Sequence, residues 1–351
     1  MTALIDAQGR PGRLAIYGAS GFIGCHLLAD LLRQGHQVRA LARSKTNAEW
    51  LRRLGADVLL GDIRDPQIVR SVAAGCDLVF HLATGRFSQG ARLLAYRETN
   101  VLGTANVMSA AADAGVRRLV FTSSMDVYGR LSRELVTEET PATPTLFHDR
   151  SKLEAERLVL RRGCELGISV VVARLPWVFG PGQPRFRKTF HQVVEKRSFT
   201  IYGSYDPWRN IAHVGDIVDG LKRCAATSPK QPGCYLLPGH NATLSEILRL
   251  IADEAGVRLR VKRKPLWPAE VTSRTCRLLL TPFGRELDFM HGVEFFVRNY
   301  RVDGSKAKCE LGYVPRTSLR ETIQGMVTWY RKSNYAGSNE HLLAQWSDFR
   351  K

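Results

Sequence analysis

A short apolar run followed at once by a glycine-rich loop constrains the fold of this chain more than any other feature of its sequence. Residues 13–17 read Arg-Leu-Ala-Ile-Tyr, and a helical pattern extends from the loop to Gln34. Glycines at intervals of three let the backbone turn tightly and approach an anion, while the following helix offers unpaired N–H groups to a pyrophosphate. The order strand, loop, helix therefore predicts a parallel α/β sheet with a dinucleotide site at this loop. We expect six residues to line that site: Gly18, Ser20, Gly21, Phe22, Ile23 and Gly24.

The second expected strand, residues 37–42, ends without an acidic residue. An Asp or Glu at this position would hydrogen-bond the ribose 2′-hydroxyl of NAD, whereas an arginine can pair with the 2′-phosphate of NADP. Arg43 and Lys45 follow the strand instead. These residues favour NADP(H) over NAD(H). In the alternative, they have no ligand and form a solvated turn on a basic protein.

Two further strands, expected at 57–61 and 78–80, also end in residues suited to a cofactor. The carboxyl ends of the strands form the ligand-binding edge of an open parallel sheet. Asp62 and Ile63 follow the first strand, and Asp62 is placed to meet the adenine amino group. Its alternative role is to cap the helix expected at Pro66. The residues after the second strand are expected to line the middle of the cofactor: Leu82, Ala83 and Thr84.

A fifth strand, residues 119–123, brings Ser124 to the same edge. With this strand the chain resembles the extended short-chain dehydrogenase/reductase family, in particular its 3β-hydroxysteroid-dehydrogenase-like and sugar-nucleotide-epimerase-like branch. The resemblance implies a Rossmann-type doubly wound parallel sheet with a smaller C-terminal substrate-binding lobe. It covers roughly residues 13–332. The motifs that carry it are Gly18 to Gly24, Asp62, Asn100 to Thr104, Thr122-Ser123-Ser124, Ser151-Lys152, Arg174 to Gly182, His213 to Asp216 and Leu311 to Pro315.

The resemblance also implies roles for site residues. Ser124 would hydrogen-bond the reacting carbonyl or hydroxyl, and Lys152 would hold the nicotinamide ribose. Such enzymes carry a tyrosine one helical turn before the lysine, and its phenol exchanges the proton with the substrate. This chain has His148 there, and no tyrosine lies between Tyr128 and Tyr202. Further implied cofactor contacts are Asn100, Thr122, Ser123, Pro176 and Val178, and further expected substrate contacts are Met125, His148, Trp177, Arg209 and Trp267.

Three roles for His148 remain open. In the first, its imidazole replaces the tyrosine as the proton donor. In the second, water or the substrate itself supplies the proton, while Ser124 and hydride delivery provide most of the catalysis. In the third, the chain does no redox chemistry and uses the bound nucleotide as a structural or sensing element. The presence of Ser124 and Lys152 disfavours this third role.

Length and composition fit one large α/β domain with a smaller lobe. The chain has 351 residues, of which 44% are hydrophobic, enough for a substantial core. No apolar run has the length of a membrane span, and residues 1–12 lack the apolar stretch of a signal peptide. We therefore expect a flexible N-terminus and a cytoplasmic protein. Its seven cysteines include no Cys-x-x-Cys pair, so neither a disulfide framework nor a metal site is expected.

The formal net charge of +18 comes from many short clusters of Arg and Lys, not from one basic arm. Such surfaces are usually solvated and bind polyanions weakly. No helix-turn-helix, zinc-finger or RNA-binding motif accompanies the charge, so nucleic acid is not an expected partner. A small anionic molecule is the expected one, and NADP carries one phosphate more than NAD.

The C-terminal half is expected to supply most of the substrate lobe. A helix over 186–197, a strand over 198–202 and a helix over 217–227 are its first predicted elements. The expected divisions of the chain are an N-terminus at 1–12, a nucleotide-binding domain at 13–180 completed by parts of 211–240, a substrate lobe at 181–335 and a tail at 336–351.

Arg209 and residues 266–290 are the expected determinants of the substrate. In sugar-nucleotide enzymes an arginine resembling Arg209 contacts a phosphate, and the alternative is an ion pair with Asp216 or Asp219. Residues 266–290 are unusually apolar for a region outside the sheet, which favours a bulky hydrophobic or aromatic substrate, although a helix also needs an apolar face to pack. The preceding Lys262-Arg263-Lys264 raises contact with anionic lipid as a weaker alternative.

The sequence therefore predicts an NADPH-dependent ketoreductase, or the reverse alcohol dehydrogenase, that acts on a polycyclic or otherwise bulky carbonyl compound. Tyrosine-lacking relatives that reduce aromatic polyketides in secondary metabolism are the comparison it suggests. The alternatives are a nucleotide-sugar epimerase or dehydratase and a non-catalytic NADP(H)-binding sensor. Homodimers through the two long helices after the fourth and fifth strands are frequent in the family that the chain resembles.

Overall fold

The computed structural model describes residues 12–85, 92–131, 135–183, 185–227 and 233–332. Both ends considered above, 1–11 and 336–351, lie outside these ranges. The largest element is a seven-stranded sheet in the order β3-β2-β1-β4-β5-β7-β11, in which every neighbouring pair is parallel. Its strands are β1 (Arg13–Tyr17), β2 (Gln37–Ala42), β3 (Asp57–Leu60), β4 (Leu78–His81), β5 (Arg118–Ser124), β7 (Ser169–Leu175) and β11 (Gly233–Leu236).

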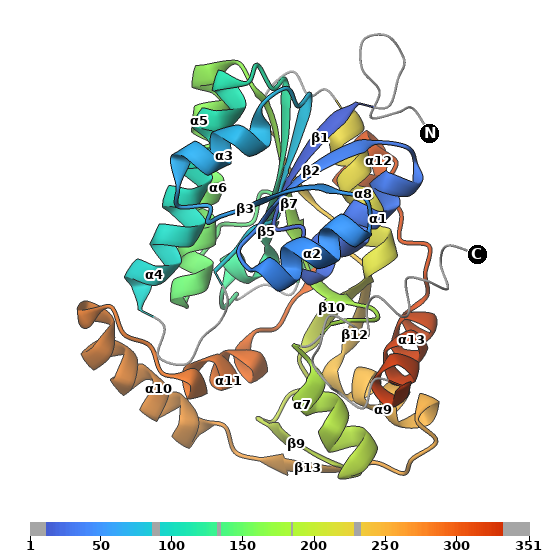
Figure 1. Ribbon diagram of the computed structural model, residues 1–351. Helices are drawn as coiled ribbons and strands as arrows, with labels where there is room; N and C mark the ends of the chain where they lie inside the picture. Colours follow the sequence, from blue (N-terminus) through green and yellow to red (C-terminus); the bar gives the residue numbers. More distant parts are fainter. Residues whose placement is uncertain (1–11, 86–91, 132–134, 184, 228–232, 333–351) are drawn as a thin grey trace.

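Helices cover both faces of this sheet (Figure 1). Side chains alternate along each strand, so Leu14 and Ile16 of β1 pack on one face while Ala15 and Tyr17 pack on the other. The first face is covered by α1 (Phe22–Arg33), α2 (Lys45–Arg53), α8 (Val214–Ala226) and α12 (Ser305–Leu311). The second face is covered by α3 (Pro66–Ala73), α5 (Gly103–Asp113) and α6 (Phe147–Leu166). This arrangement confirms the predicted Rossmann-type fold.

A second group of elements lies beyond the carboxyl ends of the large sheet (Figure 1). Its strands form a three-stranded sheet in the order β12-β10-β8 and a two-stranded parallel sheet of β13 and β9. These strands are β8 (Trp177–Phe179), β9 (Ser198–Tyr202), β10 (Trp208–His213), β12 (His240–Thr243) and β13 (Arg260–Lys264). The helices are α7 (Arg187–Phe190), α9 (Leu244–Glu254), α10 (Trp267–Leu280), α11 (Asp288–Val297) and α13 (Leu319–Lys332). The expected boundaries between domains remain predictions.

The short helix α4 and one further strand pair lie between these parts. Helix α4 (Leu93–Arg97) precedes α5, and its first amide donates to the carbonyl of Gly284 after α10 at 3.1 Å. Strand β6 (Leu135–Val136) pairs in parallel with β14 (Arg301–Val302). Helices α10 and α11 form a hairpin that projects below α4 (Figure 1). In the part of the chain that the structure describes, no helix is long and apolar enough to cross a bilayer.

The predicted elements agree with the structure where the local pattern is strong. Strands β1, β2 and β9 have the expected bounds, and the expected strand at 57–61 ends one residue early. The helix predicted over 186–197 is wrong as one continuous α-helix. It contains the short α7 and then a turn of π-helix, His191–Glu195. The helix predicted to begin at 217 begins at Val214, where the His213 side chain accepts the N–H of Gly215.

Candidate functional site

An open cleft runs along the carboxyl edge of the large sheet. It has a volume of about 980 Å³, counted with the solvent space at its mouth. The glycine loop forms one wall, the ends of β4 and β5 form the floor, and α6 and β8 form the other side. The predicted site residues that line it are Gly18, Gly21, Phe22, Ile23, Gly24, Leu82, Thr84, Thr122, Ser123, Ser124, His148, Lys152, Pro176, Trp177 and Val178.

The glycine loop leaves no room for larger residues. Gly18 has φ near +94°, and a Cβ there would stand 2.6 Å from the backbone nitrogen of Ala83. A Cβ on Gly24 would stand 2.1 Å from the carbonyl oxygen of Gly18. Ser20 lies within the turn that the amide of Gly21 closes on the carbonyl of Gly18 at 3.0 Å. The loop thus brings bare backbone and the N-terminus of α1 to the cleft, which fits a pyrophosphate.

The Ser123 hydroxyl is a second feature of the cleft that suits a bound ligand. This hydroxyl is buried and has no hydrogen-bond partner among the described residues, although the residue lines the cleft. A buried hydroxyl without a partner is unfavourable, so a polar ligand in the cleft would improve its environment. The residues present therefore fit a dinucleotide at this edge.

The charged residues that follow β2 and β3 lie at the surface, and Arg43, Lys45 and Asp62 are not part of the cleft lining. Arg43 and Lys45 are exposed, and Asp62 accepts from Arg64 at 2.9 Å. The hydrogen bond from Arg64 lowers the pKa of Asp62, and Arg43 adds to this effect. The alternative role of Asp62 as a helix cap is wrong, because Asp65 caps α3. Ile63 is buried against Gly103, away from the cleft lining.

Asn100 ties the end of β4 to α6. Its side-chain oxygen accepts the amide of Gly85 at 2.6 Å and the hydroxyl of Thr84 at 3.2 Å. Its side-chain nitrogen donates to Ser151 at 2.7 Å, and Ser151 donates to the carbonyl of His148 at 2.7 Å. Asn100 is therefore placed to position the cleft wall, and it does not line the cleft itself.

Ser124, His148 and Lys152 all line the cleft, Ser124 at its floor and the other two on the wall formed by α6. The Ser124 hydroxyl accepts the amide of Asp126 at 3.1 Å. Lys152 donates from Nζ to the carbonyl of Thr122 at 2.6 Å, and burial lowers its pKa to about 7. His148 Nε2 lies 3.5 Å from the Thr84 hydroxyl, while Nδ1 lies 3.2 Å from Asp149 Oδ1. The predicted spacing of four thus places His148 and Lys152 together on the cleft side of α6.

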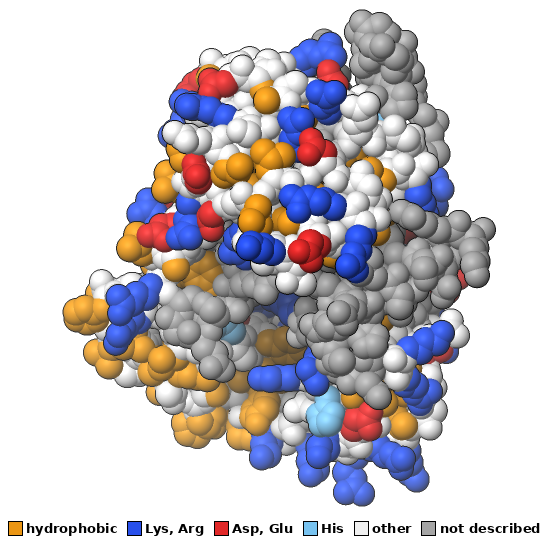
Figure 2. All heavy atoms as spheres, viewed as in Figure 1, with side chains coloured by type: hydrophobic (Ala, Val, Ile, Leu, Met, Phe, Trp, Pro, Cys, Tyr) orange, Lys and Arg blue, Asp and Glu red, His pale blue; other side chains and the backbone are white. Residues whose placement is uncertain are grey.

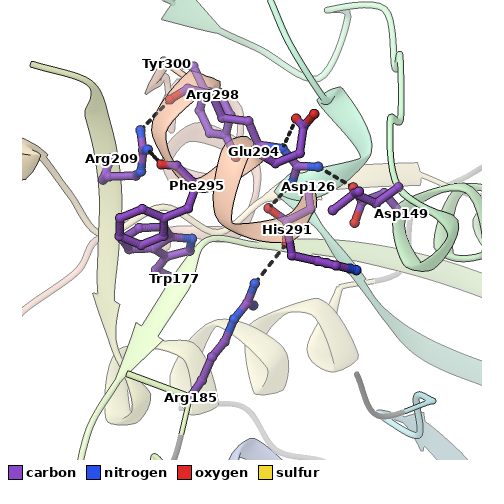
Figure 3. Close-up of a pocket in the computed structure, with 11 residues that line it drawn as sticks. Asp126, Asp149, Trp177, Arg185, Arg209, His291, Glu294, Phe295, Arg298 and Tyr300 are labelled. Carbon is purple, nitrogen blue, oxygen red and sulfur yellow. Dashed lines mark hydrogen bonds and ion pairs between the residues drawn. The ribbon is translucent and has the colours of Figure 1, made fainter. Parts of the chain in front are cut away.

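A buried charge cluster behind this wall was not predicted (Figure 3). Arg298 donates to Asp126 at 2.7 Å, to Asp149, and to Glu294 at 3.3 Å. Burial raises the pKa of Asp126, but Arg298 outweighs this effect and, with Arg185, holds that pKa at about 2. Asp149 is thus shared between Arg298 and the imidazole of His148. The position of Asp149 next to His148 was the only local signal of this contact.

Two smaller cavities adjoin the cleft on the side of this cluster. One is lined in part by Trp177, His291, Phe295 and Tyr300, and the other by Met125, Ser124 and Arg209 among others. Arg185 and Trp177 line the cleft and both cavities. The combined space offers aromatic surface next to Ser124.

Arg209 lines both adjoining cavities, and its contact with a ligand stays a prediction. Its buried guanidinium donates to the carbonyls of Trp208, Arg298 and Phe295 and lies over the rings of Trp177 and Phe295 (Figure 3). The predicted pairing with Asp216 or Asp219 is wrong. Asp216 accepts backbone amides, and Asp219 pairs with Arg223. Arg209 thus lines the cavities with Nη1 and Nη2 donating to the protein backbone, while its buried Nε has no hydrogen-bond partner among the described residues.

Trp267 and the rest of residues 266–290, expected at the substrate site, lie outside the described cavities. Trp267 is exposed on the outer side of α10, and none of residues 266–290 lines the cleft or the two adjoining cavities. Contact of this stretch with the substrate therefore stays a prediction, which the lining of these cavities does not support. The wall is supplied by the next helix, α11, through His291, Glu294 and Phe295.

Comparisons with known proteins agree with this geometry. A ketoreductase of Stigmatella aurantiaca, named for 4-hydroxy-2-methyl-3-oxo-4-farnesyl-3,4-dihydroquinoline-1-oxide, is 28% identical over 90% of this chain and 95% of its own. A putative dihydroflavonol 4-reductase of Synechocystis is 28% identical over 91% of this chain and 95% of its own. A 3-beta-hydroxysteroid dehydrogenase of Mycolicibacterium neoaurum is 27% identical over 91% of both chains.

Solved structures and a family model complete the comparison. MoeE5 in complex with UDP-glucose and NAD is 26% identical, with a TM-score of 0.72 over 92% of this chain and 100% of its own. UDP-glucose 4-epimerase of Thermotoga maritima shares the fold at 21% identity, with a TM-score of 0.74 over 92% of this chain and 99% of its own. The model of the NAD dependent epimerase/dehydratase family matches residues 14–235, more than half of the chain. The chain therefore belongs to the NAD dependent epimerase/dehydratase family.

Proposed function

We propose that this protein is an NADP(H)-dependent ketoreductase, or the reverse alcohol dehydrogenase, that acts on a bulky ring-containing carbonyl compound. The observation that carries the proposal is that Ser124, His148 and Lys152 line the same cleft as the glycine loop. The aromatic cavities next to Ser124 suit a ring system. The names of the three similar proteins also point to carbonyl or hydroxyl groups on ring systems.

We assign the binding and orienting steps to Lys152 and Ser124. When bound in the cleft, NADPH supplies the hydride that reduces the carbonyl carbon. Lys152, held by the carbonyl of Thr122, would donate its remaining N–H bonds to the nicotinamide ribose. Ser124 accepts a backbone amide with its oxygen, so its own O–H is available to donate to the substrate carbonyl.

We assign the proton to His148, which would take the place of the family tyrosine. Asp149 lies at Nδ1 and can accept its proton, which fixes the ring and leaves Nε2 on the side of Thr84. In the reduction, doubly protonated His148 would donate from Nε2 to the carbonyl oxygen. The products are an alcohol, the oxidised cofactor and a neutral imidazole that keeps its Nδ1 proton on Asp149. Water or a hydroxyl of the substrate is the alternative donor.

Steady-state reduction of defined ketones tests this assignment. The assay would follow NADPH absorbance with a dihydroflavonol, a 3-oxosteroid and a prenylated quinolone as probe substrates. We expect Ser124→Ala, Lys152→Ala and His148→Phe each to lower kcat by about 100-fold or more with whichever ketone is turned over. His191→Phe is the matched control, because His191 is exposed and lines neither the cleft nor the adjoining cavities, and it should change kcat by less than about threefold. A threefold or smaller effect of His148→Phe would assign the proton to water or substrate.

The similarity to MoeE5, a protein solved with UDP-glucose and NAD, supports one second candidate, a nucleotide-sugar enzyme. Such an activity would consume UDP-glucose without net loss of reduced cofactor, whereas a ketoreductase oxidises one NADPH for each carbonyl. The same preparation offered UDP-glucose distinguishes the two. Cofactor binding without turnover of any probe would instead support the non-catalytic sensor.

A further inference from the structure

Helix α10 turns a polar face to the protein interior and an apolar face to solvent, the reverse of an ordinary surface helix. Its inward face is polar: Glu270 pairs with Arg130 at 3.0 Å, Ser273 is fully buried, and Arg277 pairs with Glu294 at 2.9 Å. A surface helix normally turns its apolar stripe to the core and its charges to water. The interior contacts of α10 are therefore made by charges, and its apolar residues are left for the other side.

The outward face of α10 is apolar. Trp267, Val271 and Leu278 are exposed at 67%, 57% and 77%, and their spacing of four and seven places them on one stripe. Phe283, in the turn that follows, is exposed at 78%. Figure 2 shows hydrophobic side chains gathered along the projecting hairpin of α10 and α11. Patches of this kind mark interaction surfaces in soluble proteins.

Basic residues border this apolar stripe. All five residues of β13, which precedes α10, are exposed, and four of them are Arg or Lys. Between residues 258 and 287 every exposed charged residue is basic: Arg258, Arg260, Lys262, Arg263, Lys264, Arg274 and Arg285. The acids of the same stretch, Glu270 and Glu286, take part in interior contacts with Arg130 and with the amide of Phe147. The surface therefore combines exposed Trp, Leu and Phe with predominantly positive charge, and between residues 258 and 297 Asp288 at the start of α11 is its one exposed acid.

We propose that the α10–α11 hairpin docks on an anionic phospholipid bilayer. Trp267, Leu278 and Phe283 would enter the boundary between headgroups and acyl chains, and the basic residues would contact lipid phosphates. A second copy of the chain fits less well, because a self-complementary contact would place this basic surface against itself. The inference does not depend on the proposed reaction. It would also place the cavity wall formed by α11 next to the membrane, where a hydrophobic compound is dissolved.

Vesicle flotation with the full chain tests the proposal. We expect the protein to float with vesicles of phosphatidylglycerol and phosphatidylcholine, and to float far less with phosphatidylcholine alone or at high salt. Leu278→Ser/Phe283→Ser and, separately, Lys262→Glu/Arg263→Glu should each lower the partition coefficient by about tenfold or more. Circular dichroism and dinucleotide binding would verify that both variants are folded.

Two control variants test whether any loss of exposed apolar or basic residues, outside the hairpin, lowers vesicle binding. Leu135→Ser/Val314→Ser removes exposed apolar residues outside the hairpin, and Arg249→Glu/Lys308→Glu reverses two exposed charges outside it. Both should leave flotation unchanged. Absence of flotation with phosphatidylglycerol vesicles, or equal losses in all four variants, would overturn the proposal. A dimer that Leu278→Ser/Phe283→Ser dissociates, without vesicle binding by the wild type, would assign the face to self-association and also overturn it.

Discussion

Lys152 is buried on the cleft wall, and burial lowers its pKa from 10.5 to about 7. The native state therefore releases this proton at a lower pH than the unfolded chain. The resulting loss of stability is fully present below pH 7 and disappears as the pH rises from about 7 toward 10.5. In that window Lys152 should raise the free energy of unfolding of the ligand-free protein by at most about 1.4 kcal/mol per pH unit.

Urea unfolding at several pH values checks this expectation. Lys152→Met keeps the apolar stem over Phe121 and removes the amine, so the difference between wild type and variant isolates the titration of Lys152. The free energy of unfolding of the variant minus that of the wild type should fall as the pH is raised from 7 to 9, because only the wild type gains stability from the deprotonation of Lys152. Lys188→Met, which removes an exposed lysine of α7, provides the control and should show no such trend. A pH-independent difference for Lys152→Met would contradict the prediction.

Arg298 should contribute far more to stability than an exposed arginine with similar contacts. It is buried among Asp126, Asp149 and Glu294, so its removal leaves carboxylates without their partner. We expect Arg298→Met to lower the free energy of unfolding by about 3–5 kcal/mol. Arg97→Met removes one partner of an exposed pair with Glu154 at 2.7 Å and should lower it by about 1 kcal/mol or less. Urea midpoints that move equally in both variants would show that the cluster is not a stabilising unit.

At the scale of a single element, Gly24 and Gly325 give opposite predictions for the same substitution. A Cβ on Gly24 of α1 would stand 2.1 Å from a backbone carbonyl, whereas one on Gly325 of α13 would meet nothing within 4 Å. Gly24→Ala should therefore lower the free energy of unfolding by about 1–3 kcal/mol and weaken dinucleotide binding. Gly325→Ala should raise it by about 0.4–1 kcal/mol and leave binding unchanged. Thermal unfolding and a dinucleotide titration measure both effects, and a neutral Gly24→Ala would contradict the close approach of α1 to the loop.

The elements that the sequence predicted well are those whose signals are local. The loop with Gly18, Gly21 and Gly24 needs only neighbouring residues to be recognised, and β1 and β2 end at their predicted residues. The π-helical turn His191–Glu195 was missed, because a hydrophobic pattern of this length does not distinguish it from α-helix. The exposure of the apolar residues of α10 could not be predicted for another reason. A pattern shows which residues share a face, but it does not show what that face meets.

In the candidate site, too, the residues with local sequence signals were predicted and those brought in by the tertiary fold were not. Ser124, His148 and Lys152 follow a recognisable strand and helix, and the structure places all three on the cleft. The roles assigned to them remain predictions. Arg298 could not be connected with Asp149, because the two are 149 residues apart and no local pattern links them. Only the three-dimensional fold brings Arg298, at the end of α11, to Asp149 in the first turn of α6.

At the scale of the whole molecule, the cleft connects the two groups of elements and should couple cofactor binding to stability. Its lining extends from Gly18 in the large sheet's first loop to Phe186 beyond β8. A ligand that binds only the folded chain at about 100 times its Kd stabilises it by about 2.7 kcal/mol. NADPH should therefore raise the thermal midpoint by several degrees. NADH at the same concentration should raise it less, because only NADPH carries the 2′-phosphate that exposed Arg43 can pair with.

Arg43→Ala tests whether the preference for NADPH comes from Arg43 itself or from the overall positive charge of the protein. Arg43 stands directly after β2, whereas Arg53 is an exposed arginine at the far end of α2. We expect Arg43→Ala to weaken NADPH binding by about tenfold while leaving NADH nearly unchanged, so that the two thermal shifts converge. Arg53→Ala should keep them apart, since the net charge falls equally in both variants. Equal shifts with NADPH and NADH in the wild type would mean that the end of β2 does not select the 2′-phosphate, and would contradict the proposed preference for NADP(H).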